Sequence, residues 1–340
     1  MPTTTPLADF IAEKGVLLAD GAAGTNLFAM GLESGEPPEL WNESAPDKIV
    51  KLHKDFVDAG ADIILTNSFG GTAQRLKLHN AQDRVFELNK AAAEIACDVA
   101  ANAGRKVLVA GSVGPTGELL EPLGELTHDV AFASFRAQIQ GLKAGGAELI
   151  WIETMSAPGE MQAAAEAAIT EDIEYVCTAS FDTAGKTMMG LHPAEMGKVF
   201  DKTAQKPVAY GANCGVGASD ILSTLLDMNE AAPDAKIVVK GNCGIPEFQG
   251  DQIVYSGTPE LMARYVGLAV NAGATIIGGC CGTSRQHLSA MRTAMDHHIK
   301  GERPSLDDIC DQIGPMRNTK AAAQGEEPTR TRRTRGRRRA

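Results

Sequence analysis

The 340-residue sequence contains few aromatic side chains and lacks any long uninterrupted apolar run. Phe, Trp and Tyr together make up 5% of the chain. No apolar run reaches the roughly 18 residues that a membrane-spanning helix requires, and the first residues do not follow the pattern of a secretory signal peptide. We therefore expect a soluble, cytoplasmic protein with no membrane partner.

Positive charge is scarce except at the C-terminal end. The net charge is −11, with 32 Lys and Arg against 43 Asp and Glu. Seven arginines lie within residues 329–340, so the rest of the chain carries −18. A folded nucleic-acid-binding domain would need a basic face. We therefore expect no nucleic-acid partner for the folded part, and only non-specific polyanion binding by the tail.

The seven cysteines do not resemble a disulfide framework, because their number is odd and no signal peptide precedes them. The remaining interpretations are core residue, reactive thiol or metal ligand. We expect Cys97, Cys177 and Cys310 to be small buried residues. The other four cysteines follow apolar runs.

Eight short apolar runs predict strands of a parallel sheet buried on both faces. They are residues 16–20, 62–68, 107–112, 148–154, 175–180, 208–213, 237–242 and 275–280. Helical segments separate them, and eight such units in roughly 285 residues predict a (β/α)8 TIM barrel, an α/β fold. The alternative, a doubly wound sheet, would need a Gly-x-Gly-x-x-Gly turn after its first strand. Residues 20–25 do not provide one.

The domain boundaries follow from where this pattern stops. We expect residues 1–316 to form the barrel domain, with residues 301–316 as a short extension closing it. Residues 317–340 have no hydrophobic period and are rich in Arg, Thr and Gly. We expect this tail to be disordered.

Catalytic groups of such barrels lie at the C-terminal ends of the strands. Cys280 and Cys281 end the eighth run between glycines, which let the backbone turn so that both thiols can face one point. With Cys214 they would give three thiolates and leave one tetrahedral position open, as in catalytic zinc sites. Soft sulfur ligands favour Zn²⁺. A structural or redox-active cysteine pair is the alternative at this point.

Six segments carry a resemblance to a known family. They read Asp20-Gly21-Ala22-Ala23-Gly24-Thr25, Thr66-Asn67-Ser68-Phe69, Gly111-Ser112-Val113-Gly114-Pro115, Glu153-Thr154-Met155, Gly211-Ala212-Asn213-Cys214 and Gly278-Gly279-Cys280-Cys281-Gly282-Thr283. In this order, over about residues 10 to 300, they resemble the homocysteine S-methyltransferase family. That family includes betaine–homocysteine methyltransferases and the homocysteine module of cobalamin-dependent methionine synthase.

The resemblance implies roles for individual residues. Zinc would be held by Cys214, Cys280 and Cys281, and homocysteine would fill the open position and become methionine. Glu153 would bind the homocysteine ammonium, with Asp20 as a second acidic contact. The Gly21–Gly24 turn and the Thr66 hydroxyl would receive its carboxylate, because a carboxylate needs hydrogen-bond donors. We expect Asn213 to orient the loop of ligands.

The sequence identifies the methyl donor less clearly than the metal ligands. A quaternary ammonium group is usually held against aromatic faces, and the candidates here are Trp41, Phe69, Phe28 and Phe181. We expect betaine or a related onium compound. One alternative is a free-standing homocysteine component that works with separate folate- and cobalamin-binding proteins.

Two alternatives come from other classes. A non-catalytic zinc-binding protein would need a fourth protein ligand, for which Cys243 is the nearest candidate. A glycosidase using Asp20 and Glu153 as its two carboxylates would leave the cysteines at the strand ends unexplained.

Overall fold

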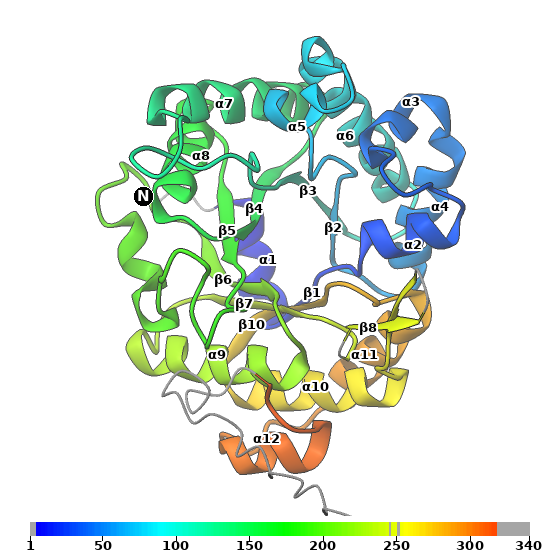
Figure 1. Cartoon of the computed structure of the whole chain (residues 1–340). Coiled ribbons are helices and arrows are strands. Elements are labelled where there is room, and N and C mark those ends of the chain that lie inside the picture. The colour runs from blue at the N-terminus through cyan, green and yellow to red at the C-terminus, as the bar shows by residue number, and fades with distance from the viewer. Residues whose placement is uncertain (1–4, 245, 250–251, 318–340) are drawn as a thin grey trace, which may run out of the picture.

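A computed structural model describes residues 5–244, 246–249 and 252–317, and it contains a ring of eight parallel strands surrounded by helices (Figure 1). The strands are β1 (Leu17–Leu18), β2 (Ile63–Leu65), β3 (Leu108–Val113), β4 (Leu149–Met155), β5 (Tyr175–Ala179), β6 (Ala209–Cys214), β7 (Ile237–Gly241) and β10 (Ala274–Gly279). Each falls within one residue of a predicted apolar run or inside it. The prediction of a TIM barrel is confirmed.

The strand order β1-β10-β7-β6-β5-β4-β3-β2 closes into a barrel between β1 and β2. An isolated parallel bridge pairs Ala19 with Ile63 at this seam. The Asp62 N–H also donates to the Leu18 carbonyl. Because β1 is only two residues long, these contacts contribute much of the closure.

The helices form the outer ring. They are α1 (Pro6–Lys14), α2 (Ala23–Ala29), α3 (Trp41–Ser44), α4 (Pro46–Asp58), α5 (Ala73–Lys77), α6 (Val85–Ala101), α7 (His128–Ala144), α8 (Pro158–Thr170), α9 (Ala218–Ala231), α10 (Pro259–Asn271), α11 (Arg285–His297) and α12 (Leu306–Ile313). None of them is long and apolar enough to cross a membrane in the part of the chain that is described. Short 3-10 helices occupy Pro38–Leu40, Gln82–Arg84 and Pro193–Phe200. The third follows β5, where the sequence predicted an α-helix.

The loop after β7 contains a hairpin that the sequence did not predict. Strand β8 (Pro246–Gln249) pairs antiparallel with β9 (Gln252–Tyr255), so Pro246 lies opposite Tyr255. The apolar runs of this segment are short and interrupted by glycines and charged residues, which hid the hairpin from a search for buried strands. It lies on the side of β7 where the site is expected, because loops that follow strands lie at their C-terminal ends.

The expectation that residues 301–316 close the barrel is wrong. Helix α12 packs outside the barrel against α9 and α10, with Ile309 and Ile313 buried. Helix α1 instead covers the interior, and it is visible behind the open centre of the ring in Figure 1. Its Leu7, Phe10 and Ile11 join the inner core of the strands. The expected tail, residues 317–340, lies outside the described residues from position 318 onward.

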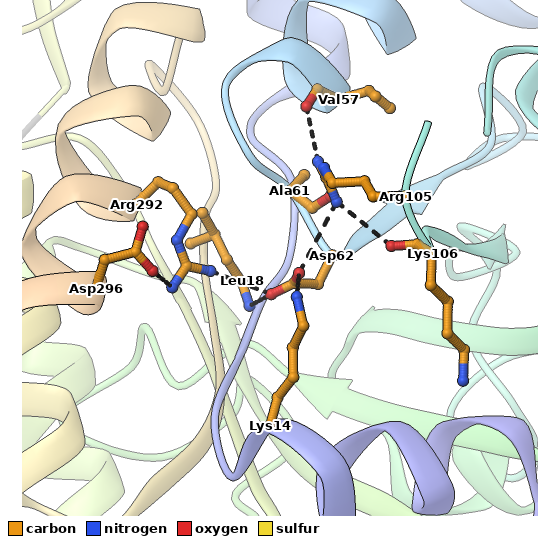
Figure 2. Close-up of polar contacts among 9 residues, drawn as sticks. All are labelled: Lys14, Leu18, Val57, Ala61, Asp62, Arg105, Lys106, Arg292 and Asp296. Atoms are coloured by element: carbon orange, nitrogen blue, oxygen red, sulfur yellow. Dashed lines mark hydrogen bonds and ion pairs between the residues drawn. The ribbon is translucent and has the colours of Figure 1, made fainter. Parts of the chain in front are cut away.

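Near the β1–β2 seam, three basic side chains surround the Asp62 carboxylate (Figure 2). The Asp62 side chain is 1% exposed, and its Oδ1 lies 2.6 Å from Lys14 Nζ, while Oδ2 accepts from the Leu18 N–H. Arg292 and Arg105 pair with the same carboxylate at 3.3 and 3.9 Å. This cluster ties α1, the β1–β2 seam and α11 together at the end of the barrel where β2 begins.

Candidate functional site

Three cysteine thiols meet at the C-terminal end of the barrel. Cys214 ends β6, and Cys280 and Cys281 directly follow β10. Their Sγ atoms all lie within 4.8 Å of one another, and each residue is partly exposed. Sulfur ligands at about 2.3 Å from one tetrahedral zinc would be about 3.8 Å apart. The structure thus brings together the three thiols that the sequence selected, and the donor set fits zinc.

The backbone explains how two adjacent cysteines reach one point. The Cys280 N–H still donates to the Gly241 carbonyl at 2.8 Å, as in a strand. The Cys281 N–H donates instead to Asn242 Oδ1 at 3.1 Å, so the chain has turned. Gly282 has a φ of +80°, a left-handed conformation that favours glycine. Side chains that would alternate in a strand therefore converge.

Cys214 itself has a φ of +63°, which is uncommon for any residue other than glycine. Such backbone strain is concentrated at functional sites, where the surrounding structure holds it in place. The strand end therefore turns Cys214 toward the other two thiols at a conformational cost.

The thiols influence one another's ionisation. Hydrogen bonds from Cys214 and Cys280 lower the pKa of the Cys281 thiol, and Tyr255 adds a further hydrogen bond to it. Hydrogen bonding to its neighbours and burial raise the pKa of Cys214. The cluster thus already favours a thiolate at one of its positions.

Cys243 does not join this cluster. In the described part of the chain, the only group of three or more candidate ligands consists of Cys214, Cys280 and Cys281. Cys243 is fully buried, and its N–H donates to the Cys281 carbonyl at 2.9 Å. Cys243 therefore contacts the cysteine loop through its backbone, and its thiol is not a fourth candidate ligand of the cluster.

Glu153 is aimed into the barrel by an irregular strand. The register between β4 and β5 shifts between Ile152 and Met155, and Thr154 has a φ of +60°. A bulge of this kind redirects a side chain. Ser112 Oγ donates to Glu153 Oε1 at 2.5 Å. Removal from bulk water raises the pKa of Glu153 to about 7, against the lowering effects of Lys240 and Ser112.

The Thr66 hydroxyl supports Ser112. It accepts from the Ser112 N–H at 3.0 Å and hydrogen-bonds with Ser68 Oγ at 2.6 Å. Because Ser68 Oγ donates to the Ser112 carbonyl, the Thr66 proton is directed to Ser68. Thr66 therefore positions Ser112, and Ser112 in turn hydrogen-bonds to Glu153. The sequence led us to expect a different role for Thr66, in which its hydroxyl faces the substrate carboxylate.

Asn213 links Thr154 to the cysteines. Its Oδ1 accepts from the Thr154 N–H at 2.8 Å and from Thr178 Oγ1 at 2.7 Å. Its Nδ2 donates to Thr154 Oγ1 at 2.7 Å and lies 3.8 Å from Cys280 Sγ. The amide therefore braces the strained Thr154 backbone and reaches the thiol cluster.

Asp20 is paired with Lys240, a residue that the sequence analysis did not select. Asp20 Oδ1 lies 2.8 Å from Lys240 Nζ, and Oδ2 accepts from the Leu65 N–H at 2.8 Å. Both side chains are almost completely buried. The signal available in the sequence was a lysine directly after Ile237–Val239, because a buried lysine needs a partner.

The turn after Asp20 lies against the cysteine loop. A side chain at Gly21 would come within 2.6 Å of the Thr283 carbonyl oxygen, so glycine is required there. The Ala22 N–H donates to that same carbonyl, and the Gly282 N–H donates to Thr25 Oγ1. The residues of the first motif and of the paired-cysteine motif thus form one wall.

Tyr255, on hairpin strand β9, is the second residue that the sequence analysis missed. Its hydroxyl hydrogen-bonds to the Cys281 thiol, and burial raises the pKa of Tyr255. Its ring carbons occupy the space beside Gly282. The hairpin therefore brings an aromatic ring to the cysteine cluster.

Comparison with known proteins agrees with this geometry. The sequence profile of homocysteine S-methyltransferases matches residues 17–295, which include every residue of the cluster. The chain belongs to the homocysteine S-methyltransferase family. Two members similar to it are the methionine synthases of Mycobacterium tuberculosis and Mycobacterium leprae, at 29% and 28% identity over 95% and 88% of this chain. The alignments span 28% and 26% of those proteins, so the chain covers about a quarter of their length.

Solved structures support the fold. The homocysteine methyltransferase MmuM from Escherichia coli, in its metallated form, superposes with a TM-score of 0.71 at 24% identity. The match covers 85% of this chain and 99% of that one. The apo form of the same enzyme gives a TM-score of 0.66 at 22% identity. This chain is therefore a member of the family with a barrel fold and three cysteines placed so that they could hold a metal ion.

Proposed function

We propose that this protein methylates homocysteine to methionine, with betaine or a related onium compound as the methyl donor. The observation that carries the proposal is the convergence of three thiols at the mouth of a barrel that also presents the Glu153 carboxylate. A thiol substrate that carries an ammonium group fits both features. The open fourth position of a three-thiolate zinc site leaves room for the substrate sulfur.

The protein's own residues would position the amino-acid end of homocysteine. Glu153, held by Ser112, would bind the ammonium group through a charge-assisted hydrogen bond. The backbone of the Gly21–Gly24 turn would face the carboxylate, since that turn adjoins the cysteine loop through Thr283. Asn213 would keep the strand-end backbone and Cys280 in register.

The metal would be held by Cys214, Cys280 and Cys281. Zinc bound there supplies Lewis-acid activation, which keeps a thiol substrate ionised and nucleophilic near neutral pH. Three thiolates leave this centre rich in negative charge, which suits a cationic donor approaching the sulfur.

Exposed aromatic rings could provide faces for an onium donor. Of the four sequence candidates, Phe28 and Phe69 are exposed by 53% and 37%, whereas Trp41 and Phe181 are 5% exposed. Lys48 Nζ already lies 4.0 Å from the centroid of Trp41. Tyr255 adds a ring beside Cys281. We therefore propose Phe28, Phe69 and Tyr255 as the faces available to an onium methyl group.

The second candidate is a homocysteine-activating component of a divided methionine synthase. The similarity to a quarter of two methionine synthases favours it. In that case the donor would be a methylated cobalamin carried by a separate protein, and a separate folate-binding protein would replenish it.

The decisive experiment measures methionine formation by the purified, zinc-loaded protein from homocysteine and one donor at a time. Betaine, dimethylsulfoniopropionate, S-methylmethionine and methylcobalamin form the four arms. We expect turnover with betaine or a sulfonium donor. Turnover with methylcobalamin alone would contradict an onium donor and establish the second candidate, and no methionine in any arm would contradict both.

Cysteine variants test the metal site independently of the donor. Cys280→Ala and Cys281→Ala should each lose bound zinc, measured by metal analysis, and lose methionine formation by at least about a hundredfold. Cys243→Ala is the matched control, since this buried thiol lies outside the cluster, and it should retain zinc. Loss of zinc in Cys243→Ala, or full activity of metal-free protein, would contradict the assignment.

A further inference from the structure

The bulge that aims Glu153 into the barrel leaves β4 without its regular pairing to β5. Two residues of β4, Glu153 and Thr154, lie opposite the single residue Thr178 of β5. The extra residue of a bulge is left out of the ladder of backbone hydrogen bonds. Thr154 also has a φ of +60°, a conformation that is unusual for a β-branched residue. The backbone next to Glu153 therefore needs support from outside the β4–β5 pair.

Asn213 provides this support from β6, on the far side of β5. Its Oδ1 accepts from the Thr154 N–H at 2.8 Å and from Thr178 Oγ1 at 2.7 Å, and its Nδ2 donates to Thr154 Oγ1 at 2.7 Å. Asn213 is 1% exposed and Thr178 is completely buried, so water hardly competes for these hydrogen bonds. The conformation of the residue after Glu153 therefore depends on one buried amide.

The same amide is connected to the cysteine cluster in two ways. Its Nδ2 lies 3.8 Å from Cys280 Sγ, within hydrogen-bonding distance of a sulfur acceptor. Asn213 also directly precedes Cys214, whose φ of +63° is uncommon for a residue other than glycine. A shift of the Asn213 side chain would therefore change the surroundings of two of the three thiols.

These contacts join the carboxylate end and the thiol end of the site into one hydrogen-bonded unit. When the cysteines hold a metal, the positions of Cys214 and Cys280 are fixed, and the Asn213 amide is fixed with them. The amide in turn holds Thr154, so the bulge that directs Glu153 is ordered before an amino acid arrives. When one binding event orders groups that a second event also requires, the second event costs less free energy.

We propose that Asn213 is a positioning residue that couples the two ends of the site, so that zinc at the cysteines increases the affinity for an amino-acid ammonium group at Glu153. The inference rests on the proposed function and adds to it a cooperativity between metal and amino acid. Because such coupling is reciprocal, an amino acid bound at Glu153 must increase the affinity for zinc by the same factor.

L-2-aminobutyrate tests this coupling, because it is homocysteine without the sulfur. It keeps the ammonium and carboxylate groups and has no thiol to bind the metal. The zinc affinity of the native protein is measured by competition with a chromophoric chelator, without and with saturating L-2-aminobutyrate at one pH. We expect the amino acid to increase the zinc affinity at least about fivefold. Calorimetry should show the same factor between the Kd values of L-2-aminobutyrate for the zinc-free and the zinc-loaded protein.

Three variants locate the coupling in the amide. Asn213→Ala removes all of its hydrogen bonds, and the factor should fall below about twofold. Thr154→Val removes only the hydroxyl that accepts from Nδ2, so it is the milder change if Asn213→Ala does not fold, and it should at least halve the factor. Glu153→Gln should also lose the effect, because the ammonium group no longer meets an anion there. An effect that persists in Glu153→Gln would show that L-2-aminobutyrate acts on the metal directly, which would overturn the proposal.

Asn67→Ala is the matched control. Asn67 is another buried amide at the C-terminal end of the barrel, and its Nδ2 donates to the Pro38 carbonyl and to Asn42 Oδ1. These hydrogen bonds join the loops that follow β1 and β2. The variant should keep the native factor even if its Tm falls. An equal loss of the factor in Asn67→Ala would indicate general loosening of this end of the barrel and would overturn the proposal.

Three further results would also overturn it. If L-2-aminobutyrate binds the native protein and leaves the zinc affinity unchanged, the two ends are independent. If Asn213→Ala and Thr154→Val both keep the native factor, the coupling does not depend on the amide. If homocysteine binds and L-2-aminobutyrate does not, the Glu153 end has no affinity of its own to be coupled. A native, zinc-loaded protein that binds neither compound would instead contradict the proposed function itself.

Discussion

At the scale of single residues, Glu153 combines strand irregularity, burial and charge in one side chain. The bulge in β4 and the positive φ of Thr154 aim the carboxylate inward, and Ser112 holds it there. Its environment raises the pKa to about 7. A carboxyl group that titrates near neutrality can change the affinity for an ammonium group within the ordinary pH range.

This leads to a pH prediction for homocysteine binding. The charged form of Glu153 is the one that attracts the ammonium, and a pKa near 7 means that it is lost as the pH falls. We expect the affinity for homocysteine to fall about tenfold between pH 8 and pH 6. Calorimetric titration at several pH values measures it.

Glu153→Gln is the matched control for that titration. It keeps the shape of the side chain and removes its ionisation, so binding should be weaker than in the native protein. Its affinity should also vary less over the same pH range. An equally steep dependence in Glu153→Gln would assign the titration to another group.

At the scale of elements, helix α4 combines an apolar face with a buried histidine. Ile49, Leu52 and Phe56 are buried on it, and His53 is 1% exposed. Among the described residues, neither ring nitrogen of His53 has a hydrogen-bond partner. Burial therefore lowers the pKa of His53 to about 4. The helix is held by apolar packing, and its histidine is stable there only when neutral.

The second prediction concerns stability in acid. Unfolded His53 takes up a proton below about pH 6.5, whereas the folded form does not until about pH 4. Stability is therefore lost as the pH falls through this interval, by about 2 kcal/mol from pH 7 to pH 5. His53→Leu should remove that part of the loss, seen as a smaller drop in Tm between the two pH values.

The exposed His297 on α11 offers a control for this measurement. His297→Leu should leave the dependence of Tm on pH close to that of the native protein. A smaller drop in Tm for His297→Leu than for His53→Leu would contradict the explanation by burial.

Elements also differ in how far the sequence predicted them. The eight strands were found because each is a continuous apolar run, the pattern of a strand buried on both faces. Hairpin β8–β9 has no such pattern and was missed, and Tyr255 with it. The bulge at Glu153–Thr154 could not be predicted either, because register depends on the neighbouring strand.

At the scale of the whole molecule, the barrel separates its polar clusters between two ends. The cysteines, Glu153 and Asp20 lie where the strands end, and Asp62 lies where β2 begins. Figure 2 shows Asp62 surrounded by Lys14, Arg105 and Arg292 from separate segments. In barrels of this type, residues at the N-terminal end of the strands serve stability and those at the C-terminal end serve chemistry.

The third prediction follows from this separation. Asp62→Ala leaves the Leu18 N–H and three cations without their shared partner, so we expect a loss of about 3 kcal/mol in the free energy of unfolding. Denaturant titration measures it. The zinc content should remain that of the native protein, because the Asp62 cluster and the cysteines lie at opposite ends of the barrel.

Asp296→Ala is the control within the same cluster. Asp296 pairs with Arg292 one turn away on α11, and its side chain is 54% exposed. An exposed pair contributes less than about 1 kcal/mol. Equal losses for Asp62→Ala and Asp296→Ala would show that burial of Asp62 is not what makes the cluster stabilising.

The sequence by itself determined the barrel, the family and the three cysteines. Apolar runs and the Gly-flanked pair Cys280-Cys281 are local patterns, and each expresses a local requirement of burial or backbone conformation. Those requirements depend on consecutive residues, so they can be recognised from the sequence alone.

The tertiary structure decided which groups meet across the barrel. It paired Asp20 with Lys240, directed Thr66 to Ser112, brought Tyr255 to Cys281 and placed α1 instead of residues 301–316 over the barrel interior. Each of these contacts joins segments far apart in the chain. Their partners are set by strand register and closure of the sheet, which depend on all eight strands together and on no single stretch of sequence.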